Sequence, residues 1–146
     1  MKKTAVVLLF TMLILLFGCS HKETTKYNYL YKGESELWIG ECSIIGTGKW
    51  TNKNNSLHYD IKKVLTITYK NDVSELYNVQ NIKIEYKTGS CSGGSLTENY
   101  DSSNPLDKKT FTIRSRSNEV PLKETVIKVK ITIDNDEQTL ELKCVN

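Results

Sequence analysis

Apolar and polar residues alternate over much of the chain after residue 26, with the period of two that is typical of half-buried β-strands. Isoleucine or valine at 127, 129, 131 and 133, for example, alternates with lysine or threonine. This pattern, with a few short apolar runs, predicts strands over residues 26–32, 37–45, 57–62, 64–70, 81–87, 96–100, 109–114, 127–133 and 140–143.

Turn-forming residues separate these segments. Glycines end the run at 37–45, and the segment Gly89 to Ser95 (GSCSGGS) is predicted to be a flexible loop. Asn71 and Asp72 are suited to cap one short helical turn over residues 73–77. Asp134 to Glu137 lies between two alternating segments, and Asp and Asn tolerate positive φ, so this stretch is the best hairpin signal in the chain.

Composition supports an all-β domain. Residues 19–146 contain no alanine, and Thr, Val, Ile and Tyr make up 39 of these 128 residues. Alanine is the best helix former and those four types favour strands, so a helical bundle is excluded. We predict an antiparallel β-sandwich, immunoglobulin-like, of about eight strands over residues 27–146. A small β-barrel is the alternative.

The N-terminus has the features of an export signal. Lys2 and Lys3 precede an apolar run over residues 5–17, which is too short to span a membrane and has the length of a secretory h-region. The end of this run and the two residues after it, Leu16-Phe17-Gly18-Cys19, resemble a bacterial lipobox. The resemblance implies a lipoprotein signal peptide over 1–18, a lipid on the Cys19 thiol, and a tether over 19–26. We therefore expect a protein anchored on the extracytoplasmic face of the cell membrane.

Three further cysteines leave the disulfide pairing open. Cys42, Cys91 and Cys144 are odd in number, so one intramolecular bridge at most can form. Alternation places Cys42 and Cys144 on core-facing positions, which favours pairing them. Cys91 is the alternative partner, and no bridge at all is the next possibility. These cysteines and His58 lack the close spacing of a zinc site, so no metal or other cofactor is expected.

The stretch Tyr29-Leu30-Tyr31-Lys32-Gly33-Glu34-Ser35-Glu36-Leu37-Trp38 resembles the opening of the mature part of a group of small Gram-positive surface lipoproteins. Their shared pattern is Tyr-x-x-x-Gly-Glu-Ser-Glu-x-Trp. Similar features continue downstream, among them residues 48–51 (GKWT) and 65–70 (LTITYK). The resemblance implies a lipoprotein with an all-β domain, and it transfers no catalytic residue.

Few residues offer chemistry. His58 is the one histidine away from the anchor, and on an alternating segment it is expected to be a solvated strand residue rather than part of a catalytic triad. Glu36 and Trp38 share a face if their segment is extended, which makes them candidate contacts for a ligand such as a sugar.

The sequence therefore predicts a non-catalytic binding module at the cell surface, whose partner is a surface protein or a wall glycan. Residues 19–146 carry 18 basic and 17 acidic side chains, and this near-balance argues against nucleic acid as a partner. The alternative function is an inhibitor or immunity-type lipoprotein that protects the envelope from a hydrolase or toxin. It would present a rigid loop, with residues 89–95 as the candidate.

Overall fold

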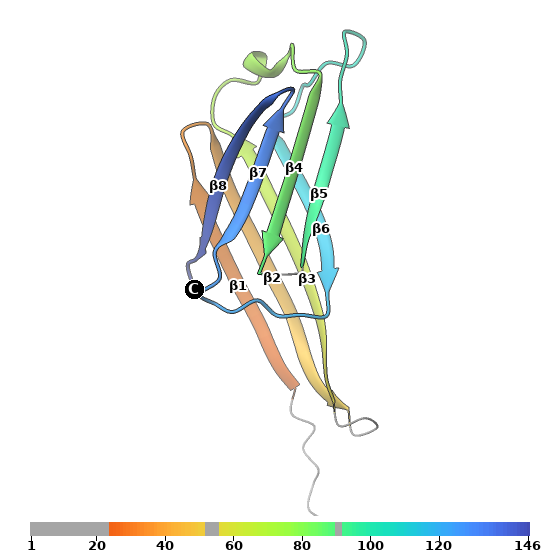
Figure 1. Ribbon diagram of the computed structural model, residues 1–146, viewed down its shortest axis with the longest axis vertical. Helices are drawn as coiled ribbons and strands as arrows, with labels where there is room; N and C mark the ends of the chain where they lie inside the picture. Colours follow the sequence, from red (N-terminus) through yellow and green to blue (C-terminus); the bar gives the residue numbers. More distant parts are fainter. Residues whose placement is uncertain (1–23, 52–55, 90–91) are drawn as a thin grey trace, which may run out of the picture.

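The computed structural model describes residues 24–51, 56–89 and 92–146. Strands account for most of them (Figure 1). The elements in chain order are β1 (Thr24–Glu34), β2 (Trp38–Thr51), β3 (Ser56–Tyr69), the 3-10 turn η1 (Val73–Leu76), β4 (Asn81–Thr88), β5 (Ser92–Asn99), β6 (Thr110–Ser117), β7 (Ile127–Ile133) and β8 (Asp136–Cys144).

The eight strands form one antiparallel sheet in the order β5-β4-β7-β8-β1-β2-β3-β6. Its two end strands, β5 and β6, come close to each other without pairing through their backbones, so the sheet curls into a nearly closed barrel. The all-β prediction is confirmed, and of the two predicted architectures the barrel alternative describes the molecule. A sandwich would have divided these strands between two separate sheets.

The barrel has a narrow junction between β1 and β8. Only Tyr31 and Lys32 of β1 pair with β8, opposite Cys144 and Lys143. Gly33 follows directly, and a side chain there would collide with the carbonyl oxygen of Glu141. Glycine therefore permits the close approach that joins the two halves of the sheet.

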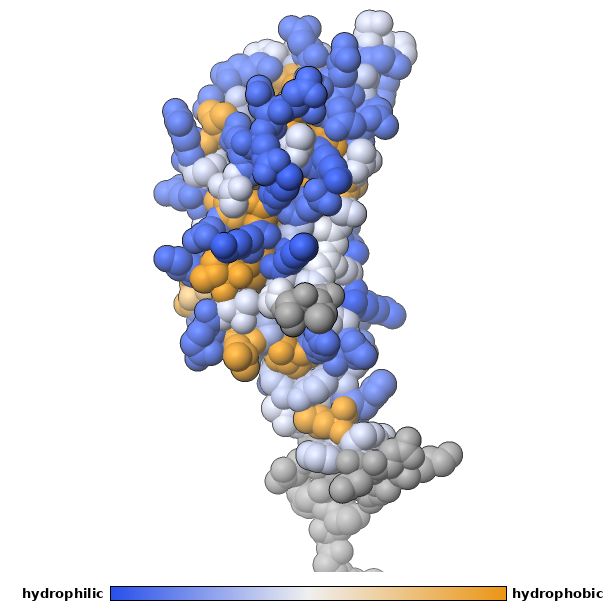
Figure 2. Space-filling model, viewed as in Figure 1, coloured by the Kyte–Doolittle hydropathy of each residue, from blue (hydrophilic) through white to orange (hydrophobic). Residues whose placement is uncertain are grey.

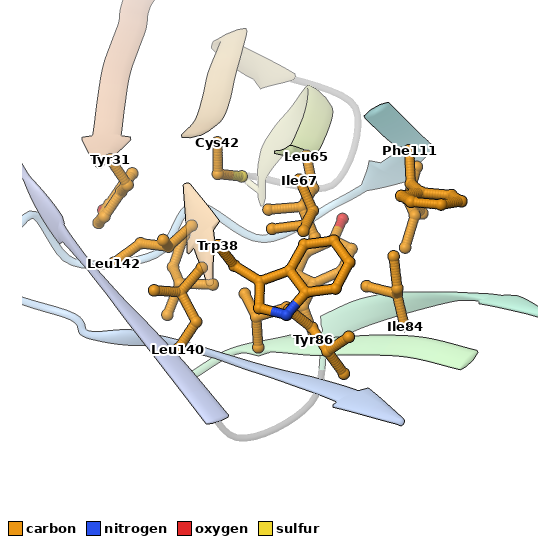
Figure 3. Close-up of a cluster of buried hydrophobic side chains, with 14 of the residues drawn as sticks. Tyr31, Trp38, Cys42, Leu65, Ile67, Ile84, Tyr86, Phe111, Leu140 and Leu142 are labelled. Carbon is orange, nitrogen blue, oxygen red and sulfur yellow. The ribbon is translucent and has the colours of Figure 1, made fainter. Parts of the chain in front are cut away.

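Inward-facing residues from all sides of the barrel form one core. Figure 3 shows Trp38 at its centre, with Leu140 and Leu142 of β8 on one side and Phe111 of β6 on another. Each strand contributes every second residue, as the sequence pattern requires. Its largest fully buried apolar members are Tyr31, Trp38, Phe111, Ile44, Ile61, Leu65, Ile67, Ile82, Ile84, Leu106 and Ile127, and Tyr69 and Tyr86 are almost fully buried.

The predicted helical turn and the predicted hairpin are both confirmed. Asp72 caps η1, because its carboxylate accepts a hydrogen bond from the Ser74 amide. Ile133 pairs with Asp136 across a two-residue turn, and Asp134 has a φ of 52°. The Asp134 carboxylate also accepts hydrogen bonds from the amides of Gln80 and Asn81, so the turn is fastened to the start of β4.

Several strand boundaries differ from the prediction. β6 and β8, expected at 109–114 and 140–143, span Thr110–Ser117 and Asp136–Cys144. The segments expected at 57–62 and 64–70 are one strand, β3, and β2 continues through the glycines at 46 and 48. The segment expected to be a loop at 89–95 is largely strand, since β5 begins at Ser92.

β1, β2 and β3 extend well beyond the rest of the barrel, toward the lower end of the view in Figure 1. Pairing of β1 with β8 is limited to Tyr31 and Lys32, and pairing of β3 with β6 begins at Ile61. Beyond these points the strand ladders run only within the three strands, and the C-terminal residues Val145 and Asn146 hydrogen-bond Leu30 and Asn28 of β1. We call residues 24–29, 46–51 and 56–59 the extension.

Candidate functional site

Trp38 does not lie where a ligand could reach it. Its side chain is 0 % exposed, and its ring centroid lies 5.0 Å from that of Tyr69 and 6.3 Å from that of Phe111. Glu36, by contrast, is exposed in the turn between β1 and β2. The expected contact pair is therefore corrected: Trp38 is a core residue, because its side chain extends from the inner face of β2 into the barrel.

The structure does not bring Cys42 and Cys144 together. Both are free, and both are register partners of Tyr31, one on each side of β1. Two strand spacings of about 4.8 Å separate them, which exceeds the Cα–Cα distance of about 7 Å that a disulfide can bridge. The expected bridge would require β1 to move aside. Cys91 and the lipid site Cys19 lie outside the described residues.

His58 is exposed on the outer face of β3, where its register partner is Lys49 of β2. Among the described residues, no three His, Cys, Asp or Glu side chains gather as metal ligands would. No helix in the described part of the chain has the length and apolarity needed to cross a bilayer.

A cluster of cations on the outer faces of β3 and β6 is the site that the sequence reasoning missed. Lys62 lies directly opposite Arg116, and Val64 lies opposite Arg114. On the other flank of Lys62 its register partner is Ile45 of β2, which is 54 % exposed. We call these five residues the basic patch. A shallow hollow of about 400 Å³ lies over its β3 and β6 members.

The charges of the basic patch are unfavourable for the fold itself. Like charges directly opposite one another destabilise an antiparallel sheet. Two other like-charge pairs occur, Lys32 with Lys143 and Lys87 with Lys128. In each of these, one lysine also bonds a glutamate, as Lys32 does with Glu41 at 3.0 Å. Within the described residues, no ion pair includes Lys62, Arg114 or Arg116.

The larger groove of the molecule has a different electrostatic character. It has a volume of about 1070 Å³ and lies over β5, β4 and β7, where Gly93 and Gly94 leave space. Of the charged residues that line it, Lys128, Lys130 and Glu85 form ion pairs with Glu141, Glu137 and Lys83, whereas Lys87 has no ion pair among the described residues. Its charges are thus largely satisfied within the chain, so it offers less to a charged partner than the basic patch does.

The basic patch has the composition of a protein-binding surface. Arginine is enriched in protein interfaces, where it commonly surrounds an apolar centre. Here Ile45 and Val64 supply the apolar centre, and the only two arginines of the chain lie beside it. The sequence signal was incomplete, because the predicted strand ended at Arg114. β6 continues to Ser117, which places Arg114 and Arg116, two residues apart, on one face.

A buried lysine lies behind the patch, inside the barrel. Lys63 is 1 % exposed, and its Nζ donates hydrogen bonds to Thr88 Oγ1 at 2.7 Å and to Ser92 Oγ at 2.6 Å. Burial lowers the pKa of Lys63, while Cys42 and Glu119 act in the opposite direction. These bonds connect β3 to the ends of β4 and β5, so Lys63 fastens the barrel at the point where its end strands do not pair.

In comparisons with known proteins, no family model matches the chain, and no curated protein or solved structure gives a match.

Proposed function

We propose that the chain is a lipid-anchored binding module at the extracytoplasmic face of the cell membrane, and that it acts without catalysis. Support for the anchor comes from the lipobox-like Leu16 to Cys19 and from the resemblance of residues 29–38 to small surface lipoproteins. The basic patch supports the binding role, because it keeps three cations unpaired around an apolar centre.

The chemistry of the patch defines the kind of partner. An acidic protein surface would neutralise Lys62, Arg114 and Arg116, and it would cover the exposed side chain of Ile45. A sugar polymer without charge would leave the cations unpaired. We therefore favour a surface protein with an acidic face over an uncharged wall glycan.

The test is crosslinking in the native membrane. A photoreactive residue replaces Thr112, which lies on the same face of β6 as Arg114. We expect one discrete protein adduct whose yield falls steeply as salt is raised, because the attraction is electrostatic. Arg116→Glu should abolish the adduct. Lys87→Glu is the matched control, because Lys87 is exposed and unpaired among the described residues but lies on β4.

Stability separates lost binding from lost folding. Arg116→Glu places a carboxylate opposite Lys62, which converts a repulsive pair into an attractive one. We expect the free energy of unfolding to rise by about 0.2–1 kcal/mol. A more stable variant that no longer crosslinks supports the proposal, while an undiminished adduct contradicts it. An adduct with a secreted hydrolase would establish the inhibitor alternative.

A further inference from the structure

The end of the extension is the part of the domain nearest to the proposed lipid. β1 begins at Thr24, five residues after Cys19. A chain advances at most about 3.6 Å per residue, so these residues span about 18 Å at full length. If Cys19 carries a lipid, the membrane surface must lie within that distance of Thr24. The rest of the barrel lies toward the other end of the molecule (Figure 1).

The residues at this end have the character of a membrane interface. Trp50 is 48 % exposed, and half-buried Leu57 is its register partner on β3. Tryptophan favours the headgroup region, where its apolar ring and its N–H are both accommodated. Figure 2 shows that the surface toward this end is largely pale with an orange patch, whereas the upper body is mostly blue with several orange patches.

Basic side chains outnumber acidic ones at this end. Lys26 and Lys49 are exposed on the outer face of the extension, and Lys49 lies opposite Thr24. Residues 22–29 and 46–60 contain four lysines and two acidic residues, Glu23 and Asp60, of which Asp60 lies opposite Thr47. Lysines close to an anionic bilayer are attracted to it, and here they outnumber the acidic residues.

The extension is also stiff enough to hold this arrangement. Tyr27 packs edge-on against Tyr59, with ring centroids 5.9 Å apart, and against Tyr29 at 6.3 Å. Gly48 is buried beneath the rings of Tyr27 and Tyr59. This aromatic cluster joins the three strands. Trp50 is therefore held in a fixed position relative to the barrel, and its contact with a membrane would fix the orientation of the whole domain.

We infer that the end of the extension rests in the headgroup region of the membrane, with Trp50 inserted and with Lys26 and Lys49 facing anionic lipid. This inference depends on the proposed lipid anchor and adds a second, direct contact between the folded domain and the bilayer. The domain then stands upright on the membrane instead of turning freely on its tether.

The chain provides its own optical test, because its only tryptophans are Trp38 and Trp50. The full-length protein is produced with its lipid and placed in vesicles of phosphatidylcholine and phosphatidylglycerol that carry brominated acyl chains. We expect the bromines to quench Trp50 and the bilayer to shield it from acrylamide in the water. Trp50→Phe leaves Trp38, which is 0 % exposed and should respond to neither quencher.

Charge reversal checks the lysines. Lys26→Glu combined with Lys49→Glu should weaken the lipid quenching and restore access of acrylamide, while Lys87→Glu on β4 should change neither. Protein that floats with the vesicles while Trp50 stays open to acrylamide overturns the inference but leaves the anchor intact. Protein that neither floats nor carries the mass of a diacylglyceryl group removes the anchor and the inference together.

Discussion

Tyr31 lies between the thiols of Cys42 and Cys144, and Tyr31 and Cys42 illustrate how burial controls ionisation in this barrel. Cys42 is fully buried, and burial raises the pKa of its thiol to about 12, with a smaller opposing effect from Lys63. Burial also raises the pKa of Tyr31 to about 12, and Cys144 adds to the effect. Both groups are therefore neutral in the folded protein at physiological pH, and Cys42 is a poor nucleophile.

These shifts predict a loss of stability in alkali. A thiol with a raised pKa binds its proton more tightly in the folded state than in the unfolded state. The contribution of Cys42 to the free energy of unfolding is therefore complete below pH 9 and is lost as pH rises toward 12. We expect the free energy of unfolding to fall between pH 9 and pH 10 by about 1 kcal/mol. Urea denaturation at these two values measures the slope.

Cys42→Ala is the control for this slope. It should lower stability at every pH through the cavity it creates, but its free energy of unfolding should change less between pH 9 and pH 10. The Tyr31 hydroxyl begins to contribute only near pH 10, its ordinary value. Parallel slopes for the two proteins would contradict the assignment to Cys42.

At the scale of the element, the path of β2 depends on Gly46 and Gly48, which the sequence pattern predicted to end the strand. At Gly46 an added Cβ would collide with the carbonyl oxygen of Asp60 and would lie 2.6 Å from Ile61 Cδ1. At Gly48 the nearest atom is 3.0 Å away and belongs to the ring of Tyr59. The half-buried ring of Tyr59 needs to shift by only a few tenths of an ångström, whereas the backbone of a paired strand cannot shift.

Alanine substitution at these two glycines should therefore have unequal effects. Gly46→Ala should destabilise the protein by about 1–3 kcal/mol, because it separates β2 from β3. Gly48→Ala should cost distinctly less, since the tyrosine rings can move aside. Thermal unfolding of both variants provides the comparison. Equal losses would show that the aromatic cluster is as rigid as the backbone.

The prediction from sequence succeeded where one face of a strand is uniformly apolar. Residues 127–133 became β7 without change, because each inward position holds isoleucine or valine. It failed at β3, where Lys63 occupies an inward position and looked like an interruption between two strands. Only the hydroxyls of Thr88 and Ser92, distant in sequence, make that burial possible.

The candidate site was predictable only in part. Placement of Tyr27, Tyr29 and Tyr31 on one face followed from alternation and is confirmed by their chain of ring contacts. The basic patch was not foreseen, because it requires the register between β3 and β6, which are separated by two other strands in sequence. Trp38 was misplaced for a related reason: alternation shows that residues share a face, but not which face is inside.

At the scale of the whole molecule, side chains close the barrel where β5 and β6 do not pair. We call this gap between β5 and β6 the seam. On one part of it the hydroxyl groups of Tyr86 and Ser115 share a hydrogen bond of 2.6 Å. Farther along, Lys108 bonds the Glu98 carboxylate at 2.7 Å, and the Tyr100 hydroxyl donates to it as well. Burial raises the pKa of Glu98, but the bonds from Lys108 and Tyr100 outweigh it and hold the pKa below its ordinary value.

The seam should consequently weaken in acid. A carboxylate with a lowered pKa contributes stability above pH 4.5, its ordinary value, and this stability is lost as pH falls through the folded pKa. Glu98→Gln should lower the free energy of unfolding at pH 6 and should reduce its decline below pH 4.5. Urea denaturation between pH 3 and pH 6 tests this expectation. Curves that differ by a constant offset would show that Glu98 does not titrate with folding.

The length of β3 determines how far above the membrane the basic patch lies, and so where a partner can bind. Lys62 lies six residues beyond Ser56, which corresponds to about 20 Å along the strand. With the end of the extension on the bilayer, the basic patch faces sideways at that height, parallel to the membrane plane. A partner must then approach laterally, as the ectodomain of a neighbouring membrane protein does. The loop around η1 and the loop between β5 and β6 would then lie farthest from the membrane, where a molecule that arrives from outside meets the protein first (Figure 1).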